Sequence, residues 1–194
     1  MKKTSFSILC LVMTLFVVTS CGPDPSKYSQ DAEGFAKLQE DFKAKFGADA
    51  YYTDIAINFT PGDSHGSGLG FHVTVTNDPA SLKMQEWVYN SYSNWRNTAD
   101  VTLEIDGDSK PEEFMYQLGG KFDLKKVGEL IEQSRKKLAD EKQIENAALN
   151  MAMLNTPDDD AATETDIVIM MKPENGGTTF TFRYDLDGNL KSFN

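Results

Sequence analysis

Asp63, Ser64 and His65 are the residue types that hydrolases use as acid, nucleophile and base. In those enzymes the three side chains come from separate parts of the fold and converge on one point. Here they are consecutive in a glycine-rich stretch, so they cannot all meet. The following Gly66-Ser67-Gly68 also lacks the G-x-S-x-G spacing of a nucleophile elbow. We therefore predict a loop over 61–68, and a hydrolase is the least favoured function class.

His72 is the only other histidine, and it alternates with Phe71 and Val73. This alternation is typical of a strand whose solvated face carries the histidine. A tetrahedral zinc site needs three or four nitrogen or sulfur ligands, which two histidines without a free thiol do not provide. Nucleotide-binding loops and zinc-protease motifs are also missing from the sequence. We expect no metal, no cofactor and no catalytic residue.

Residues 185–189 have the oxygen-rich composition of a calcium-binding loop. An EF-hand loop, however, also needs a glutamate at its twelfth position, and none follows here. Asp187 and Gly188 stand between two alternating apolar runs, and this pair is the strongest short signal for a hairpin. The stretch therefore predicts a hairpin with a type I′ turn.

Four aromatic residues, Trp87, Tyr89, Tyr92 and Trp95, form the most suggestive candidate ligand site. Exposed flat rings beside small polar residues would suit a glycan or a partner peptide. Strands of small sheets also use aromatic rings for packing, which is the more common role. Core packing and ligand binding both remain open for this set.

The N-terminal segment predicts export. Lys2 and Lys3 precede an apolar stretch over 6–18, which is shorter than the roughly 20 residues that cross a bilayer. We interpret residues 1–20 as a signal peptide. The next residues, Cys21 and Gly22, resemble a lipobox with its small preceding residues Thr19 and Ser20, which implies cleavage before Cys21 and lipidation of its thiol.

A lipidated Cys21 would hold the protein on a membrane without a transmembrane helix. Residues 21–27, with Pro23 and Pro25, would form the tether. Gly22 is not the aspartate that retains lipoproteins in the inner membrane, so we expect the outer membrane, on its periplasmic face or at the cell surface. Cys10 would leave with the signal, so the mature chain could form no internal disulfide.

Charge excludes nucleic acid as a partner. The chain of 194 residues has a net charge of −11, and removal of Lys2 and Lys3 would make it −13. Such a chain is repelled by phosphate backbones. Basic or neutral partners in the cell envelope fit this charge.

Helix and strand signals occur in an order that repeats. Apolar spacings of three and four predict helices over 31–46 and 123–142, and a capping box of Ser109 and Glu112 predicts a short helix over 112–118. Alternating residues predict strands around 55–59, 69–75, 149–153, 167–171, 180–184 and 190–193. Residues 79–96 fit either a helix or a strand with a turn, and the repeat favours the strand.

Residues 54–61 and 150–157 align at an offset of 96, with three identities in eight positions. The order of elements around them also matches. We therefore predict an α+β fold of two tandem repeats, 28–107 and 108–194. Each repeat would contain a helix or helix pair followed by an antiparallel sheet of three to four strands.

This order, with the final strand pair over 179–190, resembles PepSY-like and beta-lactamase-inhibitor-like lipoproteins of Bacteroidetes. The resemblance covers most of the mature chain, rests on no catalytic motif, and implies a binding module rather than an enzyme. We expect a non-enzymatic lipoprotein that binds an envelope protein or peptide. The alternative is a glycan-binding lipoprotein that uses the four aromatic residues.

Overall fold

The computed structural model describes residues 28–63, 66–90, 93–105, 110–120, 122–155 and 165–194. The predicted signal peptide, Cys21 and the tether lie outside these ranges. Among the described residues, neither helix combines the length and apolar composition of a membrane span.

Helix α1 (Ala32–Phe46) begins and ends where the sequence predicts. The Asp31 carboxylate accepts a hydrogen bond from the Gly34 backbone N–H at 2.9 Å, and Gly47 ends the helix with a φ of 112°. A positive φ of this kind favours glycine, which has no Cβ to clash. The buried side chains recur at spacings of three and four: Phe35, Leu38, Phe42 and Phe46.

Four antiparallel strands follow α1: β1 (Tyr51–Asp63), β2 (Gly66–Thr76), β3 (Lys83–Asn90) and β4 (Asn94–Thr102). Residues 79–96 are therefore mainly strand, as the repeat favoured. The helical alternative is limited to the 3-10 turn η2 (Pro79–Ser81), because the following residues pair with β2 and β4.

The predicted helix over 112–118 is wrong. The chain forms the 3-10 turn η3 (Pro111–Phe114) and then strand β5 (Tyr116–Gln117). Tyr116 and Gln117 pair with Tyr52 and Tyr51 of β1, and this tertiary pairing outweighs the local helix signal. Ser109 of the predicted capping box lies outside the described residues.

Helix α2 (Leu124–Lys142) follows, capped by Asp123, whose carboxylate accepts from the Lys125 N–H at 2.7 Å. Four further strands come after it: β6 (Ala147–Asn155), β7 (Asp166–Pro173), β8 (Phe180–Tyr184) and β9 (Leu190–Phe193). We call α1 with β1–β4 the first half of the fold and α2 with β6–β9 the second half.

The hairpin between β8 and β9 is confirmed, but its predicted type I′ turn is wrong. A type I′ turn needs positive φ at both central residues. Gly188 has a φ of 90°, whereas the non-glycine residues with positive φ in the described chain are Leu82, Asn94 and Gln143. The Gly188 N–H bonds to the Asp185 carbonyl, and the Asp185 carboxylate accepts from Asn189, which gives a longer, side-chain-braced turn.

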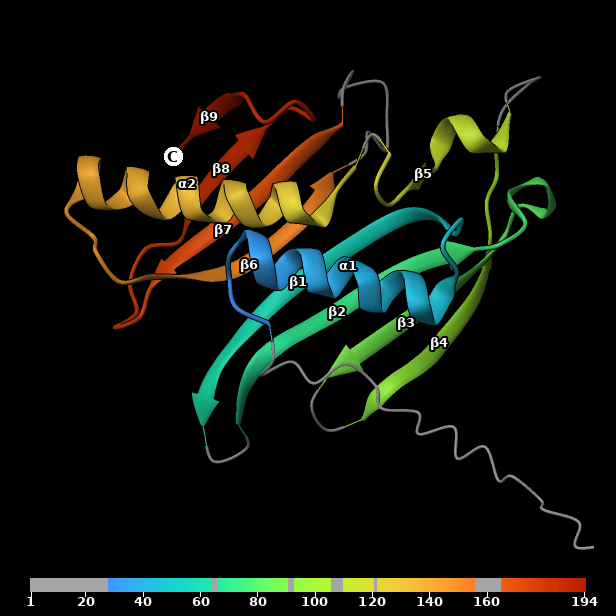
Figure 1. The fold of residues 1–194 in the computed structure, drawn as a ribbon, viewed down its shortest axis with the longest axis horizontal. Coiled ribbons are helices and arrows are strands. Elements are labelled where there is room, and N and C mark those ends of the chain that lie inside the picture. Colours follow the sequence, from blue (N-terminus) through green and yellow to red (C-terminus); the bar gives the residue numbers. More distant parts are fainter. Residues whose placement is uncertain (1–27, 64–65, 91–92, 106–109, 121, 156–164) are drawn as a thin grey trace, which may run out of the picture.

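The nine strands of the described residues belong to one antiparallel sheet, so the predicted α+β class is confirmed, but the strands form a single sheet instead of one in each predicted repeat. The strand order is β4-β3-β2-β1-β6-β7-β8-β9, and β5 adds to β1. Figure 1 shows α1 and α2 side by side on the same face of this sheet. Both halves therefore share one helix-covered face, and the described helices leave the other face free.

One core cluster runs between the helices and the sheet through both halves. The N-terminal end of the described chain joins it. Tyr28 is only 6% exposed, its hydroxyl donates to the Asp41 carboxylate, and its ring meets Phe71 edge-on at 6.1 Å.

The two helices touch most closely at Gly128. A Cβ atom at this position would lie 2.3 Å from the carbonyl oxygen of Asp31 and 2.7 Å from the Cα of Ala32. Only glycine permits this approach of α2 to the start of α1.

Candidate functional site

The predicted loop over 61–68 is wrong at both ends, because residues 61–63 continue β1 and residues 66–68 already belong to β2, where the two strands pair. Ser64 and His65 lie outside the described residues, and Asp63 ends β1. His72 lies on the helix-free face, as predicted, with its Nδ1 2.8 Å from the Asp54 Oδ2. Its direct cross-strand neighbours are Ala56 and Val88, which carry no reactive group. No group of three potential metal ligands occurs in the described part of the chain.

The described residues of the aromatic set pack against other side chains and do not form an exposed binding surface. Tyr89 is 3% exposed and stacks on Phe71 at 5.5 Å. Trp95 lies 5.1 Å from the Phe46 ring, and the Lys45 ammonium sits 4.3 Å from the centre of the Trp87 ring. These three residues therefore fill the interface between α1 and the sheet. Tyr92 lies outside the described residues.

Burial around this interface affects ionisation. Burial lowers the pKa of Lys45 and raises the pKa of Tyr52 and of Tyr116. The nearby Asp54 charge raises the pKa of Tyr116 further. The hydroxyls of Tyr52 and Tyr116 and the indole nitrogens of Trp87 and Trp95 are buried without a hydrogen-bond partner in the described structure. The rings contribute packing, and their polar atoms add no hydrogen bond to it.

The helix-free face carries an apolar strip across its centre. Strand alternation points its residues away from the core, and cross-strand pairing places Ala56 next to Met153, Met153 next to Val168, and Met151 next to Met170. Val168 is buried among its neighbours, and the others are half-buried. We call this set the central strip: Val88, Ala56, Met151, Met153, Val168 and Met170.

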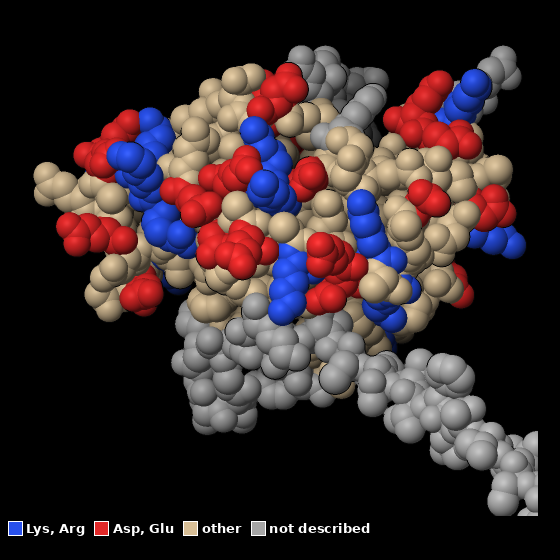
Figure 2. Space-filling model, in the orientation of Figure 1, with Lys and Arg blue, Asp and Glu red and all other residues tan. Residues whose placement is uncertain are grey.

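Charged residues border the central strip. Arg96 pairs with Val88 at one end, and Arg183 pairs with Val168 at the other. Beside Arg183, the Lys191 ammonium lies 2.7 Å from the buried Asp166 carboxylate, which Arg183 approaches to 3.7 Å. Figure 2 shows that the opposite, helix-covered face carries intermixed charges of both signs. The central strip is therefore a mainly apolar surface, which His72 interrupts between Val88 and Ala56, with one arginine at each end.

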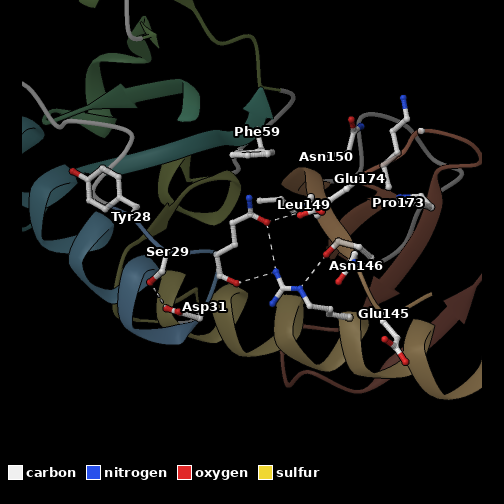
Figure 3. Close-up of a pocket in the computed structure, with 16 residues that line it drawn as sticks. Tyr28, Ser29, Asp31, Phe59, Glu145, Asn146, Leu149, Asn150, Pro173 and Glu174 are labelled. Carbon is white, nitrogen blue, oxygen red and sulfur yellow. Dashed lines mark hydrogen bonds between the residues drawn. The ribbon is translucent and has the colours of Figure 1, made fainter. Parts of the chain in front are cut away.

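A pocket of about 760 Å³ opens where β1 and β6 separate. The two strands pair only between Ala56–Asn58 and Met151–Met153, although β6 begins at Ala147 and β1 continues to Asp63. Figure 3 shows Phe59 on one side of this pocket and Asn146 on the other. Its volume falls in the usual range of small-ligand sites.

Side chains of Gln30 and Arg135 cover the unpaired edge of β6 in this pocket. The Gln30 Oε1 accepts from the Leu149 N–H at 2.8 Å, and the Arg135 Nε donates to the Ala147 carbonyl at 3.0 Å. The Arg135 Nη2 also approaches the Gln30 carbonyl and its Oε1 at 3.4 and 3.5 Å. These bonds hold the guanidinium in one orientation (Figure 3).

The sequence reasoning missed this pocket. One signal was present, because Arg135 falls four residues after Ile131 and three before Leu138 on the apolar stripe of α2. Charged residues are almost never fully buried unless they are paired, so an arginine at a core-facing position predicts a polar partner or a functional role. Its actual neighbours, Gln30 and Ala147, come from two other segments of the chain and could not be inferred from spacing.

Comparison with known proteins found no matching family model, no matching curated protein and no matching solved structure.

Proposed function

We propose that the protein is a lipid-anchored, non-enzymatic binding module of the cell envelope, which takes up a protein or peptide partner on the central strip. The observation that carries this proposal is the strip itself. A sheet face without helices that exposes methionines across two adjacent strands suits an adaptable apolar contact. Arg96 and Arg183 at its ends suit acidic groups on the partner.

Three half-buried methionines at the centre of the sheet, Met151, Met153 and Met170, favour a protein surface over a small ligand. Methionine side chains are flexible and polarisable, so one strip can repack against different apolar side chains. His72 contacts the Asp54 carboxylate at 2.8 Å, but its direct cross-strand neighbours Ala56 and Val88 add no further reactive group at this face.

We also propose that the two halves are tandem repeats. The strand order reads outward from the β1–β6 pair as β2, β3, β4 on one side and β7, β8, β9 on the other. The offset of 96 relates Ala56 to Ala152 and Ile57 to Met153. Ala56 pairs with Met153 and Ile57 pairs with Ala152, so exchanging the halves maps each pair onto the other. This register supports duplication.

The proposed anchor is Cys21, in the outer membrane on its periplasmic face or at the cell surface. Replacing Cys21 with Ala is expected to abolish lipid labelling and to leave the precursor unprocessed. Labelling that persists in this variant would contradict the anchor.

Site-specific photo-crosslinking tests the binding face. A photoreactive residue at Met153 is expected to capture one reproducible partner in the intact envelope. The matched control is Lys136 of α2, whose side chain is 75% exposed on the helix face. Met153→Asp in the uncrosslinked protein is then expected to weaken binding of the purified partner, because a carboxylate would be desolvated in the contact. Equal capture from both positions, or binding unaffected by Met153→Asp, would overturn the proposal.

A further inference from the structure

The pocket between the separated strands β1 and β6 combines two features that no residue of the central strip provides: an unpaired strand edge and an inward-facing cation. Leu149 N–H and Ala147 carbonyl lie two residues apart on the edge of β6 and point to the same side, as alternate residues of a strand do. Here side chains bond to both groups in place of a neighbouring strand.

The Gln30 side chain shows which kind of group binds to the unpaired edge of β6. Its side-chain amide has the same carbonyl acceptor as a peptide group, and this carbonyl sits 2.8 Å from the Leu149 N–H. The backbone of an extended peptide could take the same position by strand addition, once the Gln30 side chain swings away. The edge therefore favours an extended peptide over a compact ligand.

Arg135 supplies the charge. Its Nε and Nη2 bond to neutral oxygens of Ala147 and Gln30, and its Nη1 has no hydrogen bond to a described residue. Arg135 lines the pocket. No carboxylate of the described residues lies within ion-pair distance of this guanidinium.

Three carboxylates also line the pocket, those of Asp31, Glu145 and Glu174, and none of them lies within ion-pair distance of Arg135. Hydrogen bonds from Gly34 and Ser29 and, to a smaller extent, the Arg135 charge lower the pKa of Asp31. Asp31 accepts from the Ser29 hydroxyl and the Gly34 N–H, and the Glu145 side chain points away from the bonded groups in Figure 3. Lys172 adds a second cation to the lining. A guanidinium held in one orientation by neutral partners is suited to pairing with an incoming carboxylate.

We propose that this pocket binds the free carboxyl end of an extended peptide, with Arg135 pairing the carboxylate and the β6 edge at Ala147–Leu149 pairing the peptide backbone. Phe59 and Leu149 line the pocket and offer apolar contact for the peptide's last side chains. This site is separate from the central strip and does not depend on it.

The test titrates the isotope-labelled mature protein with N-acetyl-trialanine and follows the amide signals of Leu149 and Gln30 by NMR. We expect saturable shifts with a Kd of about 1 mM, since a peptide this short makes few contacts. The same peptide with an amidated C-terminus is expected to bind about tenfold more weakly, because it lacks the charge-assisted bond. Equal shifts with acid and amide, or no shifts with either, would overturn the proposal.

Two variants separate binding from a merely structural role. Arg135→Gln is expected to remove the preference for the acid, while Arg183→Gln, which deletes the same charge on the other face, keeps it. Gln30→Ala is expected to bind the acid more tightly, because it frees the Leu149 N–H that the peptide must reach. If the Gln30 and Arg135 side chains only cover the strand edge, Gln30→Ala leaves the affinity unchanged. A shift with glucuronate as large as with the peptide would assign the pocket to sugar acids instead.

Discussion

The first half of the sheet is packed with aromatic rings, whereas the second half is packed mainly with aliphatic side chains. In the first half, Phe42 of α1 touches the rings of Phe46, Phe71 and Trp95. In the second half, α2 buries Val127, Leu130, Ile131 and Leu138 against β6 and β7. The space between a helix and its strands can therefore be filled by aromatic or by aliphatic side chains in the same order of elements, as long as the side chains fill its volume.

The two halves also differ in whether their buried hydroxyl groups form hydrogen bonds. The buried Ser134 hydroxyl of α2 lies 2.8 Å from the Tyr184 hydroxyl and donates to the Leu130 carbonyl at 2.7 Å. In the first half, the buried Tyr52 hydroxyl has no partner in the described structure. The aromatic half thus gains stability from ring packing, and the aliphatic half adds a satisfied buried hydrogen bond.

Phe42→Ala is expected to have the largest effect, a loss of about 3–5 kcal/mol of unfolding free energy. The side chain is fully buried, and its removal opens a cavity among three rings. Leu138→Ala, which is equally buried in the second half, is expected to cost less because fewer atoms are removed. Urea unfolding followed by circular dichroism measures both, and a greater loss for Leu138→Ala would contradict the division into halves.

Gly128→Ala tests the contact that joins the halves. Alanine is favoured over glycine within a helix by about 1 kcal/mol. We nevertheless expect a net loss of about 1–3 kcal/mol, because the new Cβ would collide with the backbone of Asp31 and Ala32. Gln133→Ala on the exposed side of α2 is the control and should stay within about 0.5 kcal/mol of the parent. A stabilised Gly128→Ala protein would show that the helices can move apart freely.

Removing single hydroxyl groups gives the smallest and most specific contrast. Tyr184→Phe is expected to cost about 1 kcal/mol, because the Ser134 hydroxyl loses its partner. Tyr52→Phe is expected to be neutral or stabilising at neutral pH, since no hydrogen bond is lost. Paired urea titrations of the two variants measure this, and equal losses would contradict it.

The same Tyr52 variant predicts a change at alkaline pH. Burial raises the pKa of Tyr52 above that of an unfolded tyrosine, so its phenol stabilises the fold below the unfolded pKa and loses this contribution as the pH rises. Above about pH 10, the Tyr52→Phe protein should therefore lose less stability than the parent. Urea titrations at both pH values check the sign.

The sequence predicted the helices and strands whose positions depend on interactions between neighbouring residues. Asp31, Gly47 and Asp123 cap their helices as the sequence indicates, and the strand signals of both halves correspond to paired strands. Two of the failures share one cause. Tyr116 became a strand because β1 pairs with it, and Arg135 met Gln30 across 105 positions of sequence. Such partners are decided by the tertiary fold and leave only an indirect trace, here an arginine on an apolar stripe.

Tyr28, which is buried against Phe71 and bonded to Asp41, fixes the point at which the N-terminal segment joins the fold. Seven peptide units separate Cys21 from Tyr28, so a fully extended connection would span about 25 Å at most. Tyr28 also lines the pocket that contains Arg135. If Cys21 carries the proposed lipid, this short connection keeps the pocket close to the membrane surface. The peptides that reach the pocket first would then be those whose ends lie near the bilayer.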